Sequence, residues 1–112
     1  MDVFAKEFDE ALVLKLCGRL HSRTAPLLLD EVLPHSERSS KPIIVDLENL
    51  YSLNSAGYRS LHVLATRLAE NSCAMLLSNC RPEVKDRLQA AKLCEQVAIH
   101  PALDEALASL RR

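Results

Sequence analysis

Residues 43–57 read IIVDLENLYSLNSAG and hold the strongest structural signal in the sequence. Residues 43–47 (IIVDL) form a short, continuous and largely β-branched run, typical of a strand covered on both faces in the middle of a sheet. We expect a loop over residues 48–55 and then a helix. The apolar residues of that helix recur at helical spacing and are Tyr58, Leu61, Leu64, Ala65 and Leu68. The order predicts the strand–helix unit of an α/β domain.

Two strand-like segments and a helix precede this unit. Residues 2–8 and 11–17 are apolar runs separated by an acidic pair, which predicts a β-hairpin whose second strand is broken by Gly18. Thr24 stands where a helix N-cap is expected. Apolar residues follow it at three- and four-residue spacing, and we expect Pro34 and the polar segment 36–41 to end this first helix.

The same alternation continues to the end of the chain. Residues 73–77 (CAMLL) predict a buried strand, and Asn79 followed by Pro82 opens a third helix. Residues 97–99 predict a last strand, and a fourth helix follows Pro101. Together the elements predict an α/β fold with a mixed, mostly parallel sheet, an N-terminal hairpin and about four helices. The length suits a single domain over residues 1–112.

The composition argues against several classes of partner. The formal net charge is -1, and the chain holds two Tyr, two Phe and no Trp, so neither a basic field nor an aromatic platform for nucleic acid is expected. No apolar run approaches the roughly 20 residues of a membrane span, and the first residues, MDVFAKEFDE, do not resemble a signal peptide. We therefore expect a cytoplasmic protein that binds no nucleic acid directly and does not span a membrane.

Cysteine and histidine show no metal-binding or redox spacing. We expect reduced and mostly buried thiols at Cys17, Cys73, Cys80 and Cys94. Separate segments carry His21, His35, His62 and His100. No metal site and no cofactor are predicted. The G-x-S-x-G motif is absent, and His21 is the only plausible base for a hydrolase built on Ser55, so we do not expect an enzyme.

Ser55 is the strongest candidate for a functional side chain. Function in open α/β sheets gathers where parallel strands end and helices begin, and Ser55 lies at or next to the start of the second helix. A phosphate there adds about -1.5 to -2 charges beside unpaired backbone N–H groups. The spacing alone favours a structural role, in which Asn54 or Ser55 caps the helix and Gly57 relaxes its first turn.

Three segments resemble a known family. Residues 43–50 (IIVDLENL) and 54–57 (NSAG) resemble the signature of bacterial anti-sigma factor antagonists and the wider STAS domain family: an apolar strand ending in D-L, a loop, then D-S-[ST]-G opening a helix. Residues 18–21 (GRLH) with 24–26 (TAP) are similar to the family's G-x-L-D…T-A segment. Residues 79–84 (NCRPEV) resemble the start of its third helix. The resemblance covers nearly the whole chain and implies a single STAS domain.

The resemblance implies a partner-switching regulator. Ser55 matches the serine that a partner kinase phosphorylates, and its phosphorylation state controls binding to an anti-sigma factor or serine protein kinase. The ATP chemistry then belongs to the partner, and this chain needs no cofactor. The residues expected to bind the partner are His21, Thr24, Asn54, Ser55, Ala56, Gly57, Tyr58 and Arg59.

The chain also departs from the family pattern. Asn54 and His21 replace acidic residues, Ala56 follows the serine, and Arg59 stands in place of a frequent glycine. The loop is thus less negative than in the family, and Arg59 can pair with an anion. These departures favour an alternative: a STAS subunit without phosphorylation, either an accessory subunit of a lipid-transport ABC complex, bound to a membrane transporter subunit, or a signalling scaffold. Small-molecule binding is a third class, without a residue signature. We expect the third helix to present its charged residues 83–87 to solvent or to the border of a partner interface.

Overall fold

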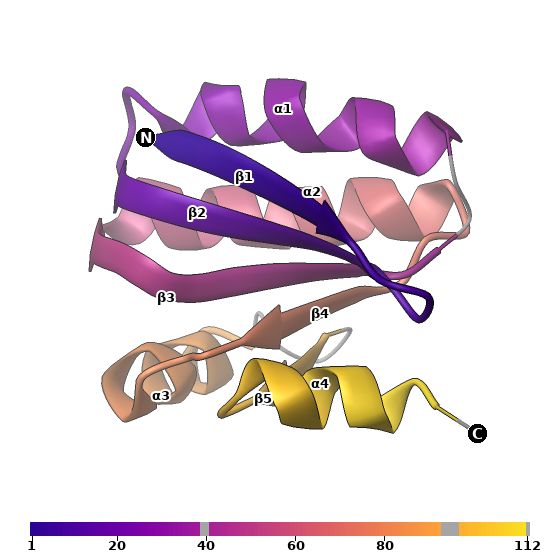
Figure 1. Cartoon of the computed structure of the whole chain (residues 1–112). Helices are drawn as coiled ribbons and strands as arrows, with labels where there is room; N and C mark the ends of the chain where they lie inside the picture. Colours follow the sequence, from indigo (N-terminus) through magenta and orange to yellow (C-terminus); the bar gives the residue numbers. More distant parts are fainter. Residues whose placement is uncertain (39–40, 93–96, 112) are drawn as a thin grey trace.

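The computed structural model describes residues 1–38, 41–92 and 97–111. These residues form five strands and four helices that alternate after an initial hairpin (Figure 1). Their bounds are β1 Asp2–Glu7, β2 Leu12–Leu20, α1 Ala25–Arg38, β3 Ile43–Leu53, α2 Ser55–Glu70, β4 Met75–Ser78, α3 Pro82–Ala90, β5 Ala98–His100 and α4 Leu103–Ser109. The predicted order of elements is confirmed.

The five strands form one sheet in the order β1-β2-β3-β4-β5. β1 pairs antiparallel with β2, which confirms the predicted hairpin. The other three pairings are parallel, so β3 lies in the centre with a parallel neighbour on each side. A mostly parallel order brings the ends of β2, β3 and β4 to one edge of the sheet, where three loops lead into α1, α2 and α3.

Both faces of the sheet are covered, but by different helices. Figure 1 shows α1 and α2 behind the sheet and α4 in front of it. On β3, Val45 joins the core cluster that contains α1, α2 and Leu88 of α3, whereas Ile44 packs into the cluster that contains Leu107 of α4. Consecutive residues on a strand point to opposite faces of the sheet, so alternate side chains of the apolar run at 43–47 pack into the two hydrophobic clusters.

β2 and β3 are both longer than the sequence predicts. β3 runs to Leu53, although a loop was expected from residue 48, and β2 runs through Gly18 to Leu20. The ladder between the strands is irregular on either side of Cys17 and Gly18, and Leu50 is buried beyond this irregularity. Gly18 sustains it at φ +111°, a backbone conformation that costs glycine little. The prediction of a loop was wrong because the polar residues 48 and 49 sit at a bulge.

α1 runs through Pro34 and ends within the polar segment 36–41 that was expected to end it together with the proline. The helix includes Pro34 and runs to Arg38. Pro34 removes one backbone hydrogen bond, but the turn beyond it is held by Ser36, which is 8% exposed. The Ser36 hydroxyl donates to the carbonyl oxygen of Leu33 at 2.7 Å and accepts from the side-chain amide of Asn71 at 3.1 Å. Tertiary contacts to the end of α2 thus keep the last turn helical.

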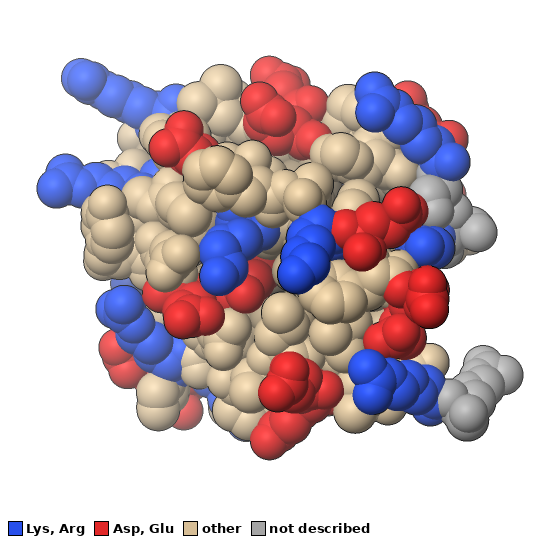
Figure 2. All heavy atoms as spheres, viewed as in Figure 1, with Lys and Arg blue, Asp and Glu red and all other residues tan. Residues whose placement is uncertain are grey.

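Charges on the face that carries α4 are mixed. Figure 2 shows basic and acidic side chains interspersed over this face. α4 has Asp104 and Glu105 in its first turn, where their charges interact favourably with the positive end of the helix dipole. It ends before Arg111, which lies 3.3 Å from the carboxylate of Glu10. Among the described residues, no helix is long and apolar enough to cross a lipid bilayer.

Candidate functional site

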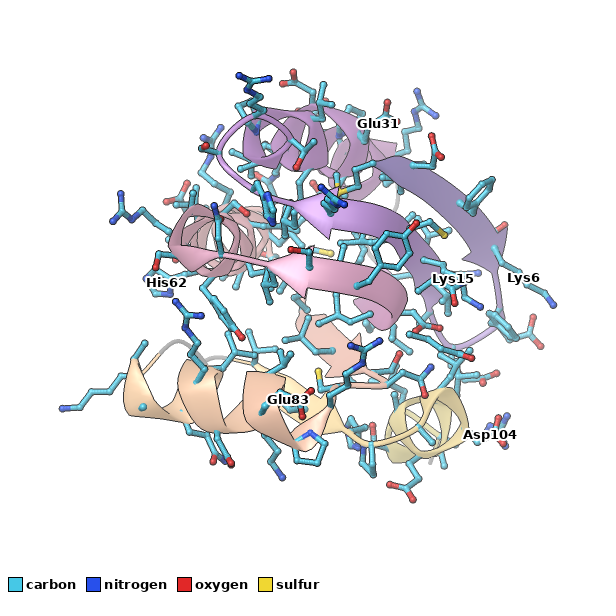
Figure 3. All side chains as sticks on the ribbon, turned by 90° about the vertical axis from the view of Figure 1, so that its left-hand side faces the viewer. Lys6, Lys15, Glu31, His62, Glu83 and Asp104 are labelled. Atoms are coloured by element: carbon cyan, nitrogen blue, oxygen red, sulfur yellow. The ribbon has the colours of Figure 1, made fainter. Side chains whose placement is uncertain are left out.

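The candidate site lies at the sheet edge where β2, β3 and β4 end. Figure 3 looks onto this edge and shows α1, α2 and α3, marked by Glu31, His62 and Glu83, arranged around the strand ends. The loops after β2, β3 and β4 therefore share one surface. Every residue assigned to the site from the sequence belongs to the first two of these loops or to the first turns of the helices that follow them.

Asn54, rather than Ser55, caps α2. Asn54 has extended backbone angles, and its side-chain oxygen accepts the backbone N–H of Gly57 at 3.0 Å. This contact satisfies one of the unpaired N–H groups of the first helical turn. Ser55 is the first residue of the helix, and it is exposed. Because the neighbour does the capping, the Ser55 side chain is left available for another role.

The first turn of α2 is pressed against the end of β2. The backbone N–H of Asn54 donates to the carbonyl oxygen of Leu20 at 3.3 Å. A β-carbon at Gly57 would collide with that same carbonyl oxygen and would approach Cδ1 of Leu53 at 2.5 Å. Only glycine fits at position 57, so the requirement is the close approach of two backbones rather than an unusual turn.

Arg87 of α3 reaches Ser55. Its Nη2 donates to the Ser55 hydroxyl oxygen at 3.0 Å, and its guanidinium lies over the Tyr58 ring, 4.5 Å from the ring centroid. Burial raises the pKa of the Tyr58 phenol, although the charge of Arg87 acts in the opposite direction. Tyr58 thus offers a neutral ring on which the guanidinium stacks.

A hollow of about 250 Å³ opens beside this contact. Its lining residues are Ser55, Tyr58, Arg59, Arg87 and Ala91. The two arginines are its charged residues. Sequence analysis placed Arg59 near the serine but left Arg87 on the solvated face of the third helix. Arg87 could not be assigned to the site from the sequence, because its position depends on the order of the strands. β3 and β4 are neighbours in the sheet, so the helices that follow them lie side by side.

A second, apolar groove of about 320 Å³ lies between the beginnings of α1 and α2. It is lined mainly by Ala25, Pro26, Leu29, Ala56 and Val63. Arg59 borders both this groove and the hollow beside Ser55. The two depressions therefore form neighbouring parts of one surface around the first turns of α2.

His21 and Thr24 organise the loop after β2. His21 Nε2 lies 2.6 Å from the hydroxyl oxygen of Ser52, so its serine partner is Ser52 and not Ser55. The Thr24 hydroxyl accepts the backbone N–H of His21 at 2.9 Å and donates to the carbonyl oxygen of Arg19 at 2.7 Å. Thr24 stands at the predicted N-cap position, directly before α1, and its carbonyl oxygen accepts the backbone N–H of Leu27 at 3.0 Å. Its hydroxyl, however, bonds within the loop ahead of the helix and not to an N–H of the first turn.

Asp46 and Asn79 join the ends of β3 and β4. Asp46 is 1% exposed, and its carboxylate accepts from the side-chain amide of Asn79 and from the backbone N–H of Glu48, each at 2.9 Å. Asn79 adopts φ +57°, and α3 begins after Arg81, whose side chain makes no capping bond. Asn79 therefore fixes the turn after β4 and does not begin α3. Asp46, the acidic residue of the D-L pattern, has a structural role in holding this turn.

The thiols differ in their exposure and in their distance from this surface. Cys73 is buried, while Cys17 and Cys80 are partly exposed; all three are free thiols, and Cys94 lies outside the described residues. Burial raises the pKa of Cys73 and raises that of Cys80 to about 11, with a further contribution from Asp46. The described part of the chain contains no group of three or more side chains placed to bind a metal ion.

Known structures share this fold. A putative anti-sigma factor antagonist from Thermotoga maritima superposes with a TM-score of 0.86 at 20% identity, over 98% of this chain and 95% of that one. An anti-sigma factor antagonist from Mycobacterium paratuberculosis gives 0.84 at 21% identity, over 99% and 94%. The Bacillus cell fate determinant SpoIIAA, in its phosphorylated form, gives 0.72 at 18% identity, over 98% and 100%. No curated protein sequence matches this chain.

The family assignment rests on the sequence as well as on the fold. The STAS domain model matches residues 3–106, which include α1 to α3, β2 to β5, all of β1 but its first residue, and the first half of α4. The neighbours of known structure include anti-sigma factor antagonists with the same arrangement over almost their whole length. With sequence and fold in agreement, the chain belongs to the STAS domain family.

Proposed function

We propose that this chain is a partner-switching regulator of the anti-sigma factor antagonist type. It binds an anti-sigma factor or serine protein kinase through the first turns of α2, and phosphorylation of Ser55 controls that binding. The observation that carries the proposal is the exposed Ser55 hydroxyl at the first residue of α2, in a STAS domain. The structure of SpoIIAA in a phosphorylated form supports phosphorylation as a form of regulation available to this fold.

The apolar groove between α1 and α2 provides the docking surface. Ala56 lines it one residue from the switch serine, and Arg59 lies on its border. We expect an apolar side chain of the partner to enter this groove, with polar contacts around it. A phosphate on Ser55 then places about -1.5 to -2 charges at the rim of a buried contact, where desolvation and repulsion weaken binding.

The phosphorylation step requires the partner to supply ATP and a base. The Ser55 oxygen attacks the γ-phosphorus, a new O–P bond forms, and the bond from that phosphorus to the bridging oxygen of ADP breaks. The hydroxyl proton passes to a base of the kinase. Arg87 must release the oxygen first, because the hydrogen bond that it donates occupies a lone pair of the nucleophile.

A phosphorylation assay tests the proposal directly. The protein is incubated with ATP and the serine kinase encoded beside its gene, and the modified residue is identified by mass spectrometry. We expect phosphate on Ser55, none in Ser55→Ala, and unchanged incorporation in Ser52→Ala. Ser52 is a matched control because it lies on the same sheet edge, but its hydroxyl is bound to His21.

Binding measurements complete the test. Ser55→Asp puts a negative charge at the switch position, and we expect it to weaken the complex at least about tenfold, as a repulsive or desolvated charge in an interface does. Absence of phosphate on Ser55, together with unchanged affinity of Ser55→Asp, would refute the switch.

One observation favours a second candidate, a STAS subunit that is not phosphorylated. Asn54 and His21 depart from the family pattern, and both have structural partners, because Asn54 caps α2 and His21 is hydrogen-bonded to Ser52. The hydroxyl of Ser55 is itself hydrogen-bonded to Arg87. Such a subunit would be an accessory subunit of a lipid-transport ABC complex or a signalling scaffold. Recovery of a membrane transporter subunit in a pull-down, with the same yield for Ser55→Asp, would decide for this candidate.

A further inference from the structure

We propose that Arg87, assisted by Arg59, is the internal receptor for a phosphate on Ser55, so that the modified serine is held by this chain itself and not only read by a partner. The inference rests on the proposed phosphorylation of Ser55 and deepens it by assigning where the phosphate goes. It is carried by the contact between Ser55 and Arg87, which joins the beginning of α2 to the body of α3.

Arg87 is already in the position that a phosphate receptor needs. Its Nη2 lies 3.0 Å from the oxygen to which the phosphorus would be attached. A phosphoryl group adds three acceptor oxygens beyond that oxygen, within reach of a guanidinium that requires only a small shift. The planar fork of arginine suits two parallel hydrogen bonds to phosphate, which a lysine ammonium cannot reproduce.

The guanidinium is held in place from behind. It stacks on the Tyr58 ring, and the ring is fixed because only 7% of Tyr58 is exposed. A long arginine side chain normally loses several rotatable bonds of freedom when it binds an anion. Stacking on a fixed ring limits that loss before any phosphate is present, so Arg87 is partly organised for its role.

Arg59 provides a second positive charge, and no acid among the described residues lines the hollow itself. The hollow of about 250 Å³ beside Ser55 is lined by Arg59 and Arg87 as its charged groups. Glu83, one turn before Arg87, lines the neighbouring groove toward β3 together with Tyr58 and Arg87, but it does not line the hollow beside Ser55. Asn54 stands where the family has an acidic residue. The replacement removes a carboxylate that would repel the phosphate and compete for both arginines.

An internal receptor changes what a partner encounters. Two arginines offset most of the roughly -2 charge of the phosphate, so the modified surface gains less net negative charge than an isolated phosphoserine would give. The guanidinium makes only a small shift toward the phosphate and stays over the Tyr58 ring. The partner therefore encounters a phosphate already paired with Arg87 rather than an exposed charge.

The experiment measures the phosphate itself. Phosphoserine is installed at position 55 during translation, and the second pKa of the phosphate is followed by phosphorus NMR as the pH is varied. We expect a value below the ordinary value of about 6, because nearby cations favour the dianion. Arg87→Gln should raise it by about half a unit to one unit, as expected for one contacting charge near a surface. Arg87→Lys should retain most of the lowering.

Arg81→Gln is the matched control. Arg81 carries the same charge at the start of the same helix but does not line the hollow beside Ser55. An equal pKa in the unmutated chain and in Arg87→Gln, or an equal rise in Arg81→Gln, would overturn the receptor role. A measurement on the unmutated chain covers the case in which Arg87→Gln does not fold: the side-chain N–H resonances of Arg87 should shift on phosphorylation, and unchanged resonances would also overturn it.

This experiment separates the inference from the proposed function. It uses neither a kinase nor a partner, so a failure of partner switching leaves its outcome unaffected. An unchanged phosphate pKa, in turn, would remove the receptor role of Arg87 while the switch at Ser55 still stood.

Discussion

Gly57→Ala tests whether the close approach of α2 to β2 positions Ser55. The added β-carbon would collide with the Leu20 carbonyl oxygen and would come within 2.5 Å of Cδ1 of Leu53. The Leu53 side chain can rotate, but the Leu20 carbonyl cannot move freely, because it accepts the backbone N–H of Asn54. The backbone of α2 therefore has to shift.

The two energetic terms have opposite signs. Alanine is favoured over glycine inside a helix by about 1 kcal/mol. Overpacking costs about 1–3 kcal/mol, and a rigid backbone partner places this site in the upper part of that range. We expect Gly57→Ala to lose about 1–2 kcal/mol of unfolding free energy overall, which corresponds to a fall of about 1 M in the urea midpoint for a domain of this size.

The assay is urea unfolding of the single variants and of the double variant with Leu53→Ala. If the Leu20 carbonyl is the main obstacle, removing the Leu53 side chain gives no rescue, and the two losses add. Gly57→Ala with wild-type or greater stability would refute the reasoning, since helix propensity would then outweigh the contact. Rescue by Leu53→Ala would instead identify the side chain as the obstacle and the backbone as adaptable.

Three further predictions concern stability. Asn54→Ala should lose about 1 kcal/mol in urea unfolding because its cap on Gly57 is removed, whereas Asn54→Asp keeps an accepting oxygen and should lose little; equal losses would contradict the cap. Ile44→Ala should lose about 2–5 kcal/mol, because Ile44 is fully buried beneath α4, and a loss below 1 kcal/mol would show that the site collapses. Cys80 has its folded-state pKa raised to about 11, so its neutral thiol favours the fold below the unfolded pKa of about 8.5, and this contribution is lost as the pH rises toward 11. Cys80→Ala should therefore reduce the decline of unfolding free energy between pH 9 and 11, and an unchanged decline would contradict the shift.

The order of the elements was predictable because each has a strong local pattern. The run at 43–47 has the length and branching of a central strand, and α2 repeats apolar residues on one face. The ends of the elements were harder, because tertiary contacts set them. β3 continues beyond Glu48 since Leu50 finds a buried position. α1 continues beyond Pro34 since Ser36 is tied to Asn71, thirty-five residues away in sequence.

The part of the candidate site formed by consecutive residues was predictable, whereas the contact between residues far apart in the sequence was not. Residues 54–59 lie together because they form one helical turn and its cap, which the sequence pattern predicts. Arg87 gives no such signal, since it stands among other charged residues on a short helix. Its contact with Ser55 depends on the neighbouring positions of β3 and β4, so it is visible only after the sheet order is known.

The departures from the family pattern and the contact with Arg87 have a common electrostatic consequence. A carboxylate at position 54 could serve as the helix cap just as well as Asn54 does, so the cap alone does not explain the amide. With Arg87 at Ser55 and Arg59 beside it, a carboxylate there would pair with these arginines and occupy the charges that a phosphate needs. The neutral amide of Asn54 still caps the helix, and both arginines remain available to bind a phosphate on Ser55. Asn54→Asp therefore separates the two roles: the stability of α2 is preserved, and the phosphate pKa rises toward its ordinary value.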